Sequence, residues 1–290
     1  MKRESETRLM WSMWQRLKAL FRGSQPMQAL PEAAGVVSAA QYEPLIFLDS
    51  NNLHWARLYI DFAEKHNLPP FSAAQMETAD DTLKQHLAGR TLKDYIKGRK
   101  LVGYLRKRCN EDAARVEYSP MTILEITCGL LRGNAIREAA GQGVTNRMWA
   151  KMDELEVLER LQPNVYHEIQ QHASDVAVQF QKVGITLETT STDRLREAWS
   201  LAQSLLGHVY LEVGDALVVA SALLAEADEI RSGDKYVRDV VNRIQNADGL
   251  VEPEKAHYKV VQAEIKKAVA AIIGVGETDI GLPKAPEGFQ

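Results

Sequence analysis

The sequence predicts an α/β protein built on a short parallel sheet, and two stretches carry that prediction. Leu45 to Leu48 is a run of four apolar residues that ends at Asp49, a pattern typical of a buried parallel strand with a polar residue at its carboxyl end. Residues 217–224 are apolar or small at every position, so a helix here would be buried on all sides.

The other elements follow from local patterns. Asp49, Ser50 and Asn51 can cap a helix that runs to about Lys65, and Pro120 suits the beginning of a later helix. Further short strands are expected at residues 115–118, 184–190 and 227–231. Further helices are expected at residues 8–22, 80–108, 120–131, 145–161, 164–182, 192–206, 214–224, 235–245 and 253–272.

The composition is that of an ordinary globular protein. The chain has 35 basic and 39 acidic residues and a formal net charge of −4, so any nucleic-acid binding must use a local basic patch. No run of 18 apolar residues is present, so no transmembrane segment is expected. The two cysteines, Cys109 and Cys128, lie outside any metal-binding spacing and suit a reducing compartment. A cytoplasmic location is therefore expected.

Three regions are expected along the chain: an N-terminal arm and linker (1–43), a main domain (44–250), and a C-terminal helix and tail (251–290). In the arm, Trp11 and Trp14 belong to the apolar face of an amphipathic helix, which could lie on a membrane surface, bind a partner, or pack on its own domain or another copy. The tail from Gly274 is rich in glycine and proline, and we expect it to be loosely held.

Residues 80–108 form a strongly basic helical segment in an otherwise acidic protein. Nine lysines and arginines stand against three aspartates, with Tyr95 and Tyr104 interleaved. This local excess could bind phosphates, although a solvated helix face would show the same charge pattern. The basic residues that we select as a nucleic-acid-binding surface are Lys93, Lys97, Arg99, Lys100, Arg106, Lys107 and Arg108.

Four acidic residues share one kind of position. Asp49 follows the first strand, and Glu125 lies early in the helix that follows the second. Asp215 begins the buried helix, and Asp234 follows it by 19 residues, after the last strand. Ligands of open α/β sheets bind beyond the carboxyl ends of the strands, which is where these acids are expected. Alternatively, Asp215 and Asp234 could be only a helix cap and a solvated turn residue.

With those motifs in this order, the sequence resembles the PIN-domain family of metal-dependent ribonucleases, which includes the toxins of bacterial toxin–antitoxin pairs. The resemblance covers about residues 44–240, and its matching pieces are LIFLDSN (45–51), TILEI (122–126), GDALVVASA (214–222) and SGD (232–234). It implies a three-layer α/β/α fold with a short parallel sheet. It also implies that Asp49, Glu125, Asp215 and Asp234 converge on Mg²⁺ or Mn²⁺, with Asn51 and Ser232 supporting them through hydrogen bonds.

The spacing between the motifs departs from the small members of that family. Asp49 and Glu125 are 76 residues apart, and Glu125 and Asp215 are 90 apart, so extra helices must be inserted on both sides of Glu125. The last strand, residues 227–231, is also more polar than a buried strand usually is. A divergent, enlarged member is the better match.

The resemblance therefore predicts a hydrolase: a Mg²⁺- or Mn²⁺-dependent endoribonuclease in which the acidic cluster holds metal ions and a bound water attacks the phosphodiester. Either RNA or DNA could be the substrate, and an antitoxin or a homodimer partner could cover the site. Two alternatives remain open. One is a non-catalytic PIN-like module that binds RNA or protein, and the other is an unrelated α/β protein whose acids are helix caps.

Overall fold

The structure is a computed structural model that describes residues 43–68, 73–141, 143, 171, 175–191 and 194–286. The chain divides into two compact units, and residues 43–134 with 162–290 form the unit that contains the sheet. The expected N-terminal arm and the helix at 145–161 lie outside the described residues, as does most of the helix expected at 164–182.

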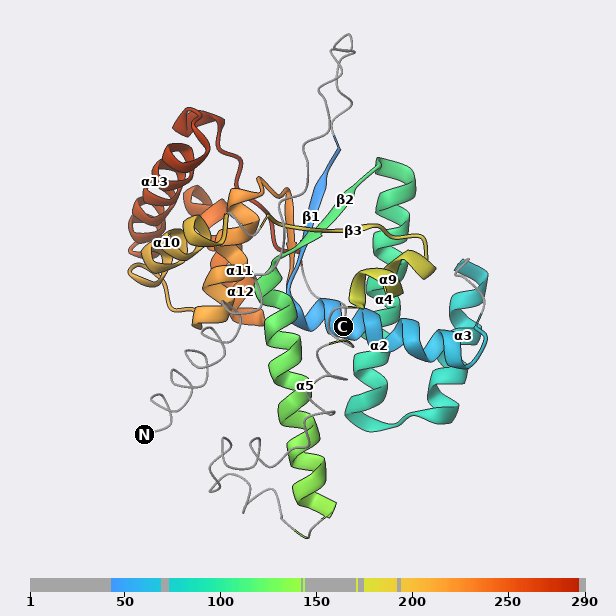
Figure 1. The fold of residues 1–290 in the computed structure, drawn as a ribbon. Helices are drawn as coiled ribbons and strands as arrows, with labels where there is room; N and C mark the ends of the chain where they lie inside the picture. Colours follow the sequence, from blue (N-terminus) through green and yellow to red (C-terminus); the bar gives the residue numbers. More distant parts are fainter. Residues whose placement is uncertain are drawn as a thin grey trace, which may run out of the picture. The chain divides into compact units, whose positions relative to one another are not determined.

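Four parallel strands form the sheet, in the order β3-β2-β1-β4 (Figure 1). They are β1 (Leu45–Leu48), β2 (Arg115–Tyr118), β3 (Leu187–Thr189) and β4 (Glu229–Arg231). In the register, Leu48 lies opposite Tyr118 and Arg231, while Tyr118 lies opposite Thr189. All four strands therefore end at one edge of the sheet, and the expectation of a short parallel sheet is confirmed.

Helices connect the strands. The helices of the described residues are α2 (Ser50–Lys65), α3 (Ala73–His86), α4 (Gly89–Asp112), α5 (Pro120–Gly141), α9 (Val176–Lys182), α10 (Leu195–Leu206), α11 (Val213–Leu224), α12 (Lys235–Gln245) and α13 (Glu254–Ile273), with 3₁₀ turns η2 (Ala247–Gly249) and η3 (Glu277–Asp279). Of these helices, none is both long and apolar enough to cross a membrane.

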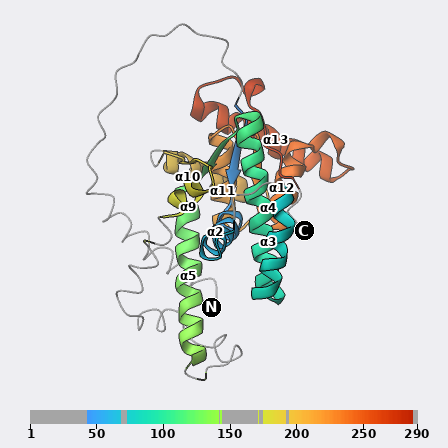
Figure 2. The same cartoon turned by 90° about the vertical axis from the view of Figure 1, so that its right-hand side faces the viewer.

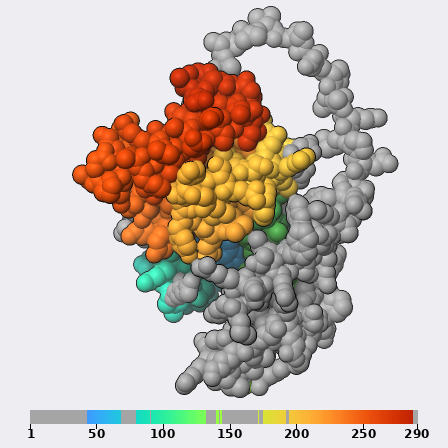
Figure 3. Space-filling model, turned by 90° about the vertical axis from the view of Figure 1, so that its left-hand side faces the viewer, coloured from blue at the N-terminus to red at the C-terminus, as the bar shows by residue number. Residues whose placement is uncertain are grey.

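The helices cover both faces of the sheet, which gives the expected three-layer arrangement. Successive side chains of β1 point to opposite faces. Leu45 and Phe47 belong to the core formed with α10 to α13, whose outer surface is seen in Figure 3. Ile46 and Leu48 belong to the core formed with α2, α4 and α9, and Figure 2 views the molecule from the side of α3 and α4.

The charged residues of β4, Glu229 and Arg231, are buried and neutralise each other. Arg231 forms an ion pair with Glu229, and both side chains are almost fully buried. The Tyr104 hydroxyl on α4 donates to Glu229, with O···O distances of 2.9 Å to both carboxylate oxygens. The Arg231 guanidinium lies 4.0 Å from the centroid of the Tyr104 ring. This pairing explains how so polar a segment can form a buried strand.

The expectation of a loosely held C-terminal tail is wrong for residues 274–286. Lys284 pairs with β4: its backbone N–H donates to Asp228 O at 3.0 Å, and its carbonyl accepts from Ile230 N at 2.9 Å. Asn242 on α12 exchanges two hydrogen bonds with the backbone of Ala285. The tail is held because it satisfies backbone groups of β4 that would otherwise lie open at the sheet edge.

Candidate functional site

The four predicted acids lie at the carboxyl edge of the sheet. Asp49 follows β1, and Asp234 follows β4 by three residues. Glu125 is in the second turn of α5, which begins directly after β2, and Asp215 is in the first turn of α11. Figure 1 shows α2 and α5 leaving the same end of the sheet. The acids are also electrostatically coupled, because the charges of Asp49, Asp234 and Glu125 all raise the pKa of Asp215.

Asp49 is the anchored member of this group. Its side chain is 1% exposed and caps α2 by accepting a hydrogen bond from the Ser50 N–H at 2.5 Å. The Ser232 hydroxyl donates to Asp49 Oδ2 at 2.6 Å, and Ser232 Oγ in turn accepts from the Asp234 N–H at 3.0 Å. Burial raises the pKa of Asp49 despite these bonds. Ser232 thus ties the first acid to the loop that carries the last one.

Glu125 approaches Asp49 from α5. Burial, followed by the charge of Asp49, raises the pKa of Glu125 to about 7, while a hydrogen bond from the Ser50 side chain lowers it. A Cβ on Gly214 would lie 1.9 Å from Glu125 Oε1, so only glycine leaves room for the carboxylate at this position. The present position of the Glu125 carboxylate therefore depends on Gly214.

Asp215 is influenced by burial and by four neighbouring carboxylates. Its pKa is raised to about 7, first by burial and then by the charges of Asp49, Asp234, Glu125 and Glu212. Its place in the first turn of α11 works in the opposite direction, because helix N-termini stabilise negative charge. At neutral pH, Asp215 is thus poised between its protonated and ionised forms.

In the described part of the chain, no basic side chain forms an ion pair with Asp49, Glu125, Asp215 or Asp234. Carboxylate oxygens are the ligands that Mg²⁺ and Mn²⁺ prefer, and a cation would relieve their mutual repulsion. The donor set therefore fits a hard divalent ion in charge and chemistry. However, the described residues contain no three acidic, histidine or cysteine side chains already gathered around one ion position.

The two predicted supporting residues differ in what they contact. Ser232 makes the expected hydrogen bond to Asp49. Asn51 is exposed at the beginning of α2 and lies beside Gly233, where a Cβ on the glycine would be 3.0 Å from Asn51 Cβ. Asn51 therefore borders the loop between Ser232 and Asp234.

The predicted basic residues are distributed along α4. Arg99 is 6% exposed and forms an ion pair with Asp80 at 2.6 Å, so it serves the packing of α3 on α4. Lys107 and Arg108 form ion pairs with acids one turn further along, and they lie in the last two turns of α4. This end of α4 leads into the beginning of β2, which lies at the edge of the sheet opposite the acids (Figure 1). We therefore omit Arg99, Arg106, Lys107 and Arg108 from the functional surface.

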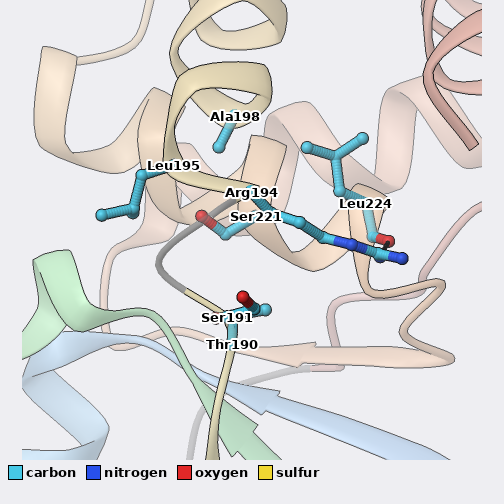
Figure 4. A pocket seen from close by; sticks show the side chains of 7 residues that line it. All are labelled: Thr190, Ser191, Arg194, Leu195, Ala198, Ser221 and Leu224. Carbon is cyan, nitrogen blue, oxygen red and sulfur yellow. Dashed lines mark hydrogen bonds between the residues drawn. The ribbon is translucent and has the colours of Figure 1, made fainter. Parts of the chain in front are cut away.

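A small cavity of about 10 Å³, enough for one water molecule, lies between α10, α11 and the segment after β3 (Figure 4). Arg194 extends across it and donates to Leu224 O at 2.6 Å. The residues that line it are Thr190, Ser191, Arg194, Leu195, Ala198, Ser221 and Leu224. None of the four acids is among them, so this cavity is not part of the acidic site.

Sequence reasoning missed three groups around the cluster. Ser50 bonds Asp49 and also lowers the pKa of Glu125. Glu212 adds a fifth negative charge that raises the pKa of Glu125 and Asp215. Trp55 packs its ring against Gly233. Glu212 could have been recognised in the sequence, because it is an acidic residue only three positions before Asp215. The effect of Ser50 on Glu125 and the contact of Trp55 with Gly233 depend on which elements meet in the fold.

Comparisons with protein-family models, with curated proteins and with solved structures found no match. A functional assignment must therefore come from the chemistry of the acidic edge itself.

Proposed function

We propose that the protein is a Mg²⁺- or Mn²⁺-dependent nuclease that hydrolyses phosphodiester bonds, with RNA as its substrate. The observation that carries the proposal is the convergence of Asp49, Glu125, Asp215 and Asp234 on one edge of a parallel sheet, across 185 positions of sequence. Burying like charges together is costly for folding, and the cost is most readily understood if a cation binds there.

Each acid has a separate part in this proposal. Asp49 is held by hydrogen bonds from Ser50 and Ser232 and would bind a metal ion together with Asp215, while Glu125 and Asp234 would hold a second ion or orient water. Bound divalent ions supply Lewis-acid chemistry that neutralises phosphate charge and lowers the pKa of water.

The decisive experiment measures cleavage of labelled RNA by the full-length protein with Mn²⁺ and with EDTA. We expect cleavage with Mn²⁺ and none with EDTA. Asp215→Asn should reduce the rate at least about 100-fold, since even residues that only support metal ligands typically cost 10- to 100-fold. Asp239→Asn is the matched control, because Asp239 is an exposed aspartate on α12 outside the cluster. Cleavage that survives EDTA or Asp215→Asn would refute the proposal.

A second candidate is a non-catalytic module that binds nucleic acid. It is favoured by one observation, namely that the described acids are not gathered as ligands around a single ion position. The same experiment separates the two candidates. Retention of RNA without cleavage at any Mn²⁺ concentration identifies a binding module, whereas metal-dependent cleavage identifies the nuclease.

A further inference from the structure

One face of α4 carries a basic stripe that passes the acidic edge. Lys93, Lys97, Lys100, Tyr104 and Arg108 follow one another at spacings of three or four residues, so they share one face of the helix.

The stripe runs antiparallel to β4. Tyr104 contacts Glu229 at the beginning of the strand, whereas Lys97 lies against Trp55, whose ring packs on Gly233 beyond the strand's end. Lys97 and Arg108 are separated by about 16 Å along the helix axis at 1.5 Å per residue. Only the first part of the stripe therefore lies at the edge that carries the acids.

Lys97 is held next to the last acidic motif by an aromatic ring. Its Nζ lies 4.3 Å from the centroid of the Trp55 ring. A Cβ on Gly233 would be only 2.4 Å from Trp55 Cη2, so the ring rests directly on the glycine. Gly233 separates Ser232, which bonds Asp49, from Asp234. A chain of contacts thus joins the Lys97 ammonium to the loop between Ser232 and Asp234.

A second glycine allows this arrangement. A Cβ on Gly98 would lie 2.0 Å from the Trp55 carbonyl oxygen, so α4 can approach α2 this closely only because residue 98 is glycine. The next residue back along the helix, Lys97, is thereby brought over the ring. Its side chain remains one-third exposed, and its ion pair with Asp94 is long, at 3.9 Å. Such a pair contributes little, so a phosphate can replace it.

We propose that Lys97 binds the backbone phosphate next to the one that is cleaved, with Trp55 as the positioning residue that holds it there. The nucleic acid then leaves the acidic cluster across Trp55 toward Lys97 and the exposed Lys93, and does not follow the last turns of α4. The placement beside a cleaved phosphate rests on the proposed nuclease function.

The test measures binding rather than cleavage. Full-length Asp215→Asn protein is titrated with a labelled single-stranded RNA of about 12 nucleotides, between about 50 and 200 mM salt. Adding Lys97→Gln should weaken binding roughly fivefold and reduce the slope of log K against log salt by about 0.7, the share of one phosphate on a single strand. Lys107→Gln is the matched control on the same helix, and we expect it to change neither quantity.

A second pair of variants tests the role of Trp55. Trp55→Phe keeps an aromatic face under Lys97 and should retain the salt slope, whereas Trp55→Leu should lose as much slope as Lys97→Gln. Thermal unfolding shows whether each variant is folded. Equal slopes for the Phe and Leu variants would overturn the positioning role.

Other outcomes distinguish this inference from the nuclease proposal. An unchanged slope for Lys97→Gln, an equal loss for Lys107→Gln, or no RNA binding by the parent protein overturns the inference. Binding that depends on Lys97 in a protein that does not cleave RNA with Mn²⁺ supports the phosphate contact and refutes the nuclease.

Discussion

Small residues decide how closely the carboxylates approach one another. Gly214 leaves the space into which Glu125 extends, and the Ser232 hydroxyl fits between Asp49 and the Asp234 backbone. A larger side chain at either position would separate acids that the fold brings together. The geometry of the site therefore depends on the small size of Gly214 and Ser232 as well as on the carboxylates themselves.

Gly214→Ala should lower the rate of RNA cleavage without lowering the stability of the folded protein. Alanine favours a helix over glycine by up to about 1 kcal/mol, so the variant should fold at least as well as the parent if the end of the Glu125 side chain can move away. Displacing Glu125 should lower the cleavage rate at least about tenfold. The measurements are thermal unfolding and RNA cleavage with Mn²⁺.

The control is Gly129→Ala in α5, where an added Cβ meets no atom within 4 Å. It should gain similar stability and keep its activity. If Gly214→Ala were as active as the parent, the Glu125 carboxylate would not need its present position.

At the scale of elements, β4 shows how a polar segment becomes a buried strand at the edge of the sheet. Glu229 and Arg231 neutralise each other, and Tyr104 from α4 satisfies the carboxylate from the other side. Ser232 and Asp234 follow this strand in the sequence, so the position of the strand sets theirs. A buried ion pair contributes to specificity of this register rather than to a large net stability.

Glu229→Ala should destabilise the protein by about 3–5 kcal/mol, because it removes the carboxylate that neutralises the buried Arg231. Tyr104→Phe should cost only about 1 kcal/mol, the typical value of a hydrogen bond. Chemical denaturation measures both. Glu64→Ala removes an exposed ion pair with Lys182 and should cost less than about 1 kcal/mol. A similar loss for Glu229→Ala and Glu64→Ala would contradict this account.

For the whole molecule, the acidic edge opposes folding unless protons or cations compensate it. Glu125 and Asp215 ordinarily have pKa values of 4.5 and 3.8, and the fold raises both to about 7. The folded protein therefore binds more protons than the unfolded chain between these values. By linkage, the contribution of these two groups to the free energy of unfolding falls as the pH rises through this window.

Without metal, we expect the unfolding temperature to be higher at about pH 5 than at about pH 7.5, and Asp215→Asn should reduce this difference. Adding Mn²⁺ at the higher pH should restore stability, by about 2.7 kcal/mol at a concentration 100 times the dissociation constant. Thermal unfolding in EDTA and in Mn²⁺ measures both effects. An equal response of Asp215→Asn and the parent protein to pH and to Mn²⁺ would show that the cluster binds no metal.

The sequence by itself determined the elements that rest on local patterns. The apolar run at 45–48 and the segment at 115–118 form strands with the expected bounds, and helices begin at Ser50 and Pro120 as predicted. The four acids were also identifiable, since each follows or begins such an element. Hydrophobic periodicity and capping act over a few residues, so they can be recognised without knowing the rest of the fold.

Only the tertiary structure decided which of these residues meet. It brought Glu125 to Gly214 across 89 positions and satisfied Glu229 with a tyrosine 125 residues away. It also buried Arg99 against Asp80, placed Lys97 on Trp55, and left Lys107 and Arg108 in the last two turns of α4, away from the acids. Strand register and helix packing set these contacts, and both depend on the combined burial of many distant side chains rather than on any local pattern.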